Sequence, residues 1–133
     1  MSQLRNLLYV ICLSLTVTAV LAEPNSYPDG HGGEVAFPMG DVSFADTVVG
    51  YTAGDPAPVE RAGDPEAALG VPDIGEHDNG GYLTLGCGGE LVMAFEDNAL
   101  VDVAGPDLYV FEIGPDVEPT ALAVSADGKA WTR

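Results

Sequence analysis

The chain has 133 residues, enough for one domain, and carries 21 acidic residues against four basic ones, a formal net charge of −17. This charge argues against nucleic acid and anionic lipid as partners, because both would be repelled. Two readings of the charge stay open: the acidic surface of a soluble exported protein, or a supply of oxygen ligands for calcium.

Residues 1–22 have the pattern of a secretory signal peptide, in which one basic residue, Arg5, precedes an apolar run. Small residues place the expected cleavage site after Ala22. The alternative is a retained anchor, but the run is shorter than the about 20 residues of a membrane-spanning helix. We therefore expect an exported mature chain without a transmembrane span. Cleavage would change the net charge from −17 to −18, because it removes Arg5 and no acidic residue.

The next segment, 23–40, is rich in Pro, Gly, Asp and Asn and has little apolar periodicity, so it is predicted to be a flexible acidic arm. The folded domain is expected over 41–133. Its first β-like pattern lies in 41–51, and a Pro- and Gly-rich loop follows in 54–63.

Residues 64–70 predict a single helical turn. Asp64 can accept hydrogen bonds from the free N–H groups, and Pro65 suits the first helical position. Gly70 can end the turn in a left-handed conformation. A polar loop follows, over 74–81.

Three further stretches predict strands. In 90–95 the large apolar side chains fall at every second position, Leu91, Met93 and Phe95, and this period of two is typical of a half-buried antiparallel strand. Residues 108–113 are mainly β-branched and aromatic, lie between two Gly-Pro pairs, and predict a buried strand in the middle of a sheet. Residues 120–125 predict a third strand.

Asp127 and Gly128 are expected to supply the two positive-φ positions of a tight hairpin turn. Trp131, just after this turn, is expected to pack in the core. The chain stops soon afterwards, so we expect the sequence to be a fragment that ends inside its own fold. Short strands at regular intervals, separated by Gly, Pro and Asp turns, favour an all-β fold, an antiparallel β-sandwich or barrel.

Two carboxylates are the candidate metal ligands, Asp73 and Glu112. Glu112 lies on an apolar strand face, where an isolated charge is costly. Either backbone N–H groups at the sheet rim satisfy it, or it contacts calcium or another ligand. Asp73, with Glu76 and Asp78 in the same loop, could supply oxygens to one cation. The alternative is a solvated acidic loop.

Catalysis has little support in the sequence. The only histidines are His31 and His77, and no nucleophile elbow, zinc-protease motif or paired-cysteine motif occurs. We therefore expect a protein that is not an enzyme. Cys87 is the only cysteine after the leader, and it either fills a turn or pairs with another cysteine outside these residues. Tyr82, Tyr109 and Trp131 are candidate aromatic contacts for a ligand whose identity the sequence leaves open.

Three segments together resemble a known family. The stretch 124–132, Val-Ser-Ala-Asp-Gly-Lys-Ala-Trp-Thr, is similar to a signature of discoidin-like (galactose-binding-like) β-sandwiches. The stretches 67–73 and 105–112 resemble an exported bacterial cell-surface module of that fold. Such modules occur N-terminally in proteins of the outer-membrane-protein-A-like (OmpA) family.

The resemblance implies a jelly roll that binds rather than catalyses, with a structural calcium for which Asp73 and Glu112 are the candidate ligands. It also implies a periplasmic, outer-membrane or cell-surface location and a peptidoglycan-binding domain beyond residue 133. The module would serve adhesion, glycan binding or structural attachment. The alternative is a purely structural spacer without a ligand. The chain departs from the family pattern after Trp131, where further strands are expected.

Overall fold

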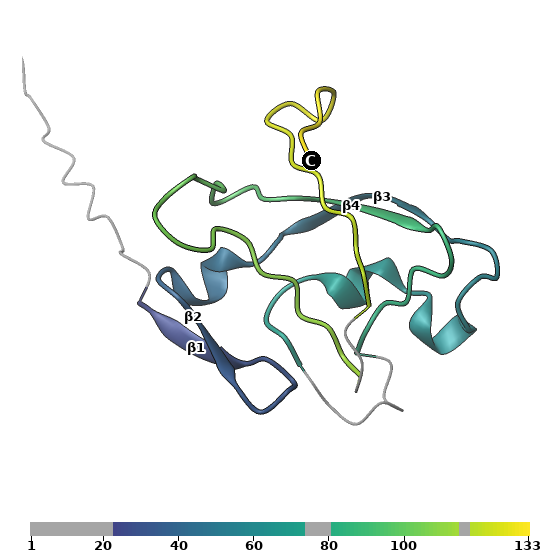
Figure 1. Ribbon diagram of the computed structural model, residues 1–133, viewed down its shortest axis with the longest axis horizontal. Helices are drawn as coiled ribbons and strands as arrows, with labels where there is room; N and C mark the ends of the chain where they lie inside the picture. Colours follow the sequence, from purple (N-terminus) through teal and green to yellow (C-terminus); the bar gives the residue numbers. More distant parts are fainter. Residues whose placement is uncertain (1–22, 74–80, 115–117) are drawn as a thin grey trace, which may run out of the picture.

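The protein is described by a computed structural model that covers residues 23–73, 81–114 and 118–133 (Figure 1). The predicted signal peptide, 1–22, lies outside these residues. The described chain is a small all-β fold, with two two-stranded antiparallel sheets and only short 3-10 helices. The strands are β1 (Asn25–Pro28), β2 (Glu34–Phe37), β3 (Thr47–Thr52) and β4 (Glu90–Ala94); the helices are η1 (Gly40–Ser43), η2 (Glu60–Ala62) and η3 (Pro65–Ala68).

The first sheet corrects the prediction that 23–40 is an arm without structure. Strands β1 and β2 pair as an antiparallel hairpin, from Asn25 opposite Phe37 to Pro28 opposite Glu34. Tyr27 anchors it and is only 4% exposed. Part of the polar and glycine residues that suggested an arm, those of 29–33, form the hairpin turn. There the Asp29 carboxylate accepts hydrogen bonds from the backbone N–H groups of His31 and Gly33, both at 2.8 Å.

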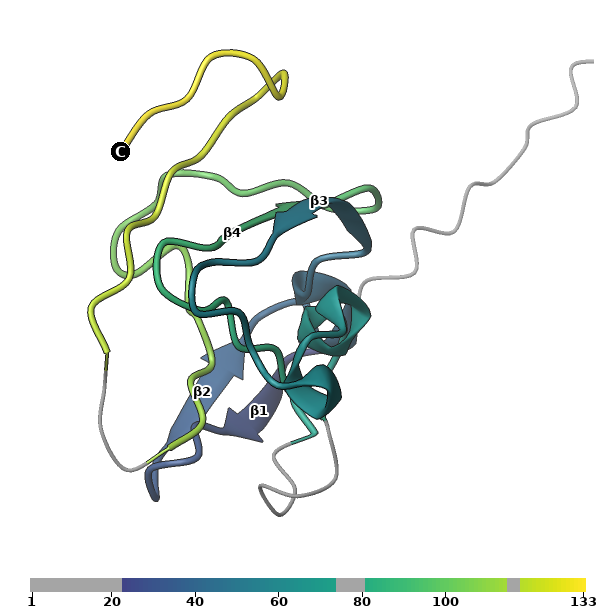
Figure 2. The same cartoon turned by 90° about the vertical axis from the view of Figure 1, so that its right-hand side faces the viewer.

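The second sheet confirms the strand pattern predicted over 90–95. Strand β4 pairs with β3 from Thr47 opposite Ala94 to Thr52 opposite Glu90. The register shifts between Val48 and Gly50, and Val49 is 64% exposed at this irregularity. Figure 2 shows this sheet on the opposite side of the molecule from the β1–β2 hairpin.

Two glycine-rich turns pack backbone against backbone beside the second sheet. The N–H of Gly54 donates to the carbonyl of Leu85 at 2.8 Å, and the N–H of Asp55 donates to that of Cys87 at 3.0 Å. A Cβ atom on Gly54 would lie 2.3 Å from the Cys87 oxygen, and one on Gly89 would lie 2.1 Å from the Leu85 oxygen. Only residues without a side chain allow this approach.

The helical turn predicted at 64–70 is present as η3. The Asp64 side chain accepts a hydrogen bond from the N–H of Glu66 at 3.1 Å, and Pro65 is its first residue. Gly70 follows with φ +75°. Just before η3, Ala62 is 2% exposed, and its carbonyl accepts a hydrogen bond from the N–H of Thr84 at 2.8 Å.

The prediction of a buried central strand at 108–113 is wrong. These residues form no strand, and Leu108, Tyr109 and Val110 are 38%, 39% and 52% exposed. Within the described part of the chain, no backbone N–H or C=O of 108–113 has a hydrogen-bond partner. A strand requires a neighbour that satisfies its backbone, which high β-propensity alone does not supply.

The C-terminal turn also differs from the prediction. Val124 and Thr132 exchange two backbone hydrogen bonds, at 2.8 and 2.9 Å, in an isolated antiparallel bridge. Between them lies a longer loop than the expected two-residue turn, and only Gly128, at φ +68°, has positive φ. The Asp127 carboxylate shapes this loop by accepting hydrogen bonds from two backbone N–H groups, which lie two and three residues further on, both at 2.9 Å.

Trp131 is 48% exposed, which corrects the prediction that it packs in the core. The loop that precedes it extends away from both sheets (Figures 1 and 2).

Candidate functional site

An aromatic cluster joins the N-terminal hairpin to the segment that follows β4. Phe37 on β2 and Phe44 after η1 have ring centroids 5.2 Å apart, and the ring of Phe111 lies 6.0 Å from each. Tyr27 completes the hairpin side, 4.9 Å from Phe44, and Tyr109 lies 4.8 Å from Phe111. Such distances suit favourable edge and offset ring contacts. The cluster therefore holds 109–111 against the hairpin without any strand pairing.

The hydroxyl of Tyr27 donates a hydrogen bond to the Asp41 carboxylate at the start of η1. Burial of the phenol is the main cause that raises the pKa of Tyr27, and the hydrogen bond to Asp41 raises it further. The neutral phenol therefore ties β1 to η1.

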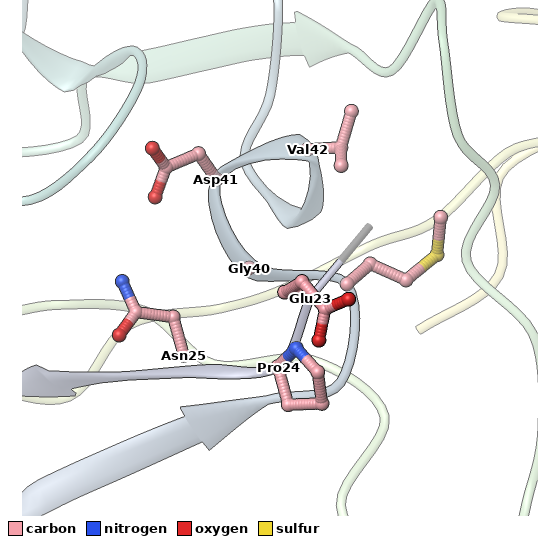
Figure 3. A pocket seen from close by; sticks show the side chains of 7 residues that line it. Glu23, Pro24, Asn25, Gly40, Asp41 and Val42 are labelled. Carbon is pink, nitrogen blue, oxygen red and sulfur yellow. The ribbon is translucent and has the colours of Figure 1, made fainter. Parts of the chain in front are cut away.

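Beside this contact is a shallow surface depression, shown in Figure 3. Its lining comes from the start of the described chain and from the β2–η1 connection: Glu23, Pro24, Asn25, Met39, Gly40, Asp41 and Val42. Gly40 has φ +57°, and a Cβ there would lie 2.5 Å from the backbone oxygen of Glu23. The Asp41 carboxylate in this lining is already hydrogen-bonded to Tyr27.

The structure does not bring the two predicted calcium ligands into a recognisable site. Asp73 is exposed, with its carboxylate close to Gly81, where a Cβ would lie 2.8 Å from Oδ2. Glu112 is half-buried, and its Oε1 accepts a hydrogen bond from the N–H of Glu118 at 2.8 Å. This bond matches the first reading of Glu112, a carboxylate satisfied by backbone.

In the three described ranges, no group of three or more His, Cys, Asp or Glu side chains is placed to hold a metal ion. The loop residues Glu76 and Asp78 lie outside the described residues, so their predicted part in a cation site is untested.

The other predicted contacts lie apart in the structure. Tyr82 is half-buried, Tyr109 belongs to the aromatic cluster, and Trp131 has no ring partner among the described residues. Cys87 is exposed and carries a free thiol in its glycine-rich turn.

The feature that the sequence analysis missed is a run of exposed apolar side chains over 100–110. Every residue of this run is exposed, and its only described backbone hydrogen bond joins the N–H of Val103 to the Asp107 carboxylate, at 3.0 Å. The large apolar members are Leu100, Val101, Val103, Leu108, Tyr109 and Val110, between 38% and 60% exposed. Because apolar runs usually mark buried strands, composition alone predicted that these side chains would be buried.

Acidic residues surround this run. The sequence has seven Asp and Glu residues between 96 and 118, and no Lys or Arg between Arg61 and Lys129. Along the sequence, the run therefore combines apolar side chains with acidic neighbours and no basic ones.

Comparison with protein-family models, with curated protein sequences and with solved structures found no match. No helix in the described ranges has the length and apolar character needed to cross a lipid bilayer.

Proposed function

We propose that the chain is a non-enzymatic binding module of a bacterial cell envelope or cell surface, exported by its N-terminal leader. The observation that supports this proposal most strongly is the set of apolar and aromatic side chains that the described fold leaves exposed to solvent. Trp131, Tyr109 and Val110 are 48%, 39% and 52% exposed. Exposed apolar surface of this kind favours a role in recognition.

The finer features of the proposal come from the sequence. The leader supports export, and the resemblance to discoidin-like modules supports a jelly-roll sandwich that serves adhesion, glycan binding or attachment, N-terminal to a peptidoglycan-binding domain. A calcium ion held by Asp73 and Glu112 stays a prediction. Calcium titration of the wild-type chain and of an Asp73→Asn variant would test it.

A glycan-binding measurement on the mature chain separates the binding module from the structural spacer. Trp131→Ala removes an exposed ring that has no described aromatic contact, so it should leave the fold intact. Val59→Ala, at another exposed position, is the control. The binding module is supported if the chain binds envelope polysaccharide, if Trp131→Ala weakens this binding at least tenfold, and if Val59→Ala leaves it unchanged. If neither variant changes binding, or the wild-type chain binds no polysaccharide, the spacer is the better account.

A further inference from the structure

The segment 108–113 has the composition of a strand but no strand neighbour in the described fold. Its side chains are mainly β-branched and aromatic, and its backbone N–H and C=O groups have no hydrogen-bond partners within the described residues. Figure 2 draws the chain here as a tube that passes close to β2, not as a strand arrow. Such a segment presents the features of an unpaired sheet edge, which can pair with another chain.

The aromatic cluster fixes this segment in place. The ring of Phe111 lies 6.0 Å from both Phe37 and Phe44, so one side of the segment is held against the hairpin. Leu108 and Val110 remain 38% and 52% exposed. The ring of Phe111 thus attaches the segment to the fold, and no described residue occupies its backbone N–H and C=O groups. This arrangement reduces the ordering cost that a fully flexible strand would pay on binding.

Charge selects the kind of partner. The surrounding stretch is acidic, with Asp102, Asp107 and Glu112 along it and no Lys or Arg between Arg61 and Lys129. A second copy of this chain, at −17, would be repelled, and parallel in-register pairing would place Asp107 opposite Asp107. A basic strand with alternating apolar side chains would satisfy the backbone, cover the apolar side chains and neutralise the acids.

We propose that residues 108–113 form a docking strand, which pairs with an extended basic and apolar polypeptide by β-strand addition. This inference deepens the proposed binding function by naming the partner chemistry. Its test is separable from the glycan-binding test, because the residue changed there, Trp131, lies outside the docking strand.

The test uses the mature chain and synthetic peptides of about six residues, a usual strand length. The probe alternates Val and Lys, one control alternates Val and Glu, and a second control has a central proline in the Val/Lys sequence. Amide hydrogen exchange is followed at 108–113, and affinity is measured by calorimetry. We expect the Val/Lys peptide to bind and slow exchange there. The Val/Glu peptide should not bind, and proline should weaken binding because it removes a backbone donor.

A double variant, Leu108→Ser with Val110→Ser, tests the apolar part of the interface. Both side chains are about half-exposed, so the loss of their further burial should weaken Val/Lys binding roughly thirtyfold. The matched control is Val59→Ser with Val71→Ser, at positions 62% and 44% exposed, and it should change nothing.

Three results would overturn the proposal. Equal binding of the proline peptide would mean attraction by net charge alone. Equal weakening by the control variant would mean that the apolar side chains of 108–113 are not the contact. Slow exchange at 108–113 without peptide would mean that the segment is already paired. The pairing is within one chain if the protection is independent of protein concentration, and between copies of the chain if the protection increases with concentration.

Discussion

Replacement of Phe111 by alanine is the sharpest test of how the fold holds together. Phe111 brings the segment after β4 against Phe37 on the N-terminal hairpin and Phe44 after η1, with ring centroids 6.0 Å from each. Asn98 adds a second link, a hydrogen bond to the carbonyl of Val42. The described chain has only two buried hydrophobic residues, Tyr27 and Ala62, so few other contacts can compensate. A small core of this kind leaves little stability in reserve.

The size of the effect follows from the exposure of Phe111. A fully buried Phe→Ala change costs about 3–5 kcal/mol. Because Phe111 is only half-buried, we expect about 2 kcal/mol, which is a fall in Tm of about 10 °C for a chain of this size. Phe111→Leu keeps part of the apolar contact and loses the ring pairs, so it should cost about half as much.

Urea denaturation followed by far-ultraviolet circular dichroism measures these differences. Fluorescence of Trp131 is unsuitable, because this residue is exposed and lies far from the cluster along the chain. The control Val59→Ala, at a position 62% exposed, should lie within about 0.5 kcal/mol of wild type. If Phe111→Ala is no more destabilising than Val59→Ala, the segment 109–111 does not pack on the hairpin, and the reasoning fails.

Three further predictions follow from local geometry. Gly54→Ala should unfold the two packed glycine-rich turns, or lower the folding stability several times as much as Gly70→Ala, because the added Cβ would lie 2.3 Å from the Cys87 oxygen. Comparable urea midpoints for the two variants would contradict this prediction. Hydrogen bonds from the backbone N–H groups of His31 and, to a smaller extent, of Gly33 lower the pKa of Asp29 in the folded chain. The ionised Asp29 carboxylate therefore stabilises the fold above about pH 3.9, its usual pKa, and this stabilisation is lost as the pH falls through the lowered pKa. Asp29→Asn should reduce this acid sensitivity, and an unchanged acid midpoint would contradict the assignment. The raised pKa of Tyr27 predicts the opposite pH dependence, in which stability is lost as the pH rises above about 10. The Tyr27→Phe variant should lose less stability in alkali than the wild type, and an equal loss in both proteins would contradict this prediction.

Local sequence signals predicted local structure well. The cap residue Asp64 and the proline that follows it mark η3 because the hydrogen bond from Glu66 to Asp64 is made within three residues. The strand predicted over 90–95 is likewise present as β4, although its burial does not alternate, because Leu91 and Val92 are both half-buried and Met93 is exposed. The sequence also favoured an all-β fold, which the two small antiparallel sheets show, whereas the finer sandwich assignment stays a proposal.

Features that depend on distant neighbours were not predictable in this way. The hairpin at 25–37 was missed because its stability depends on Tyr27 meeting Phe44, a contact that composition does not reveal. The strand at 108–113 was predicted from propensity, but a strand also needs a paired backbone, which the described chain does not provide. Of the two candidate ligands, only Glu112 makes a contact that the sequence analysis considered, since its carboxylate accepts a hydrogen bond from a backbone N–H group.

Residue-resolved amide hydrogen exchange on the mature chain alone tests the central claim most directly. The account predicts fast exchange at 108–113, whose amides have no partners in the described fold. It predicts slower exchange at the amides of β4 that bond to β3. If 108–113 is protected as strongly as β4, the segment is already part of a sheet, and it cannot serve as a strand that a basic partner completes.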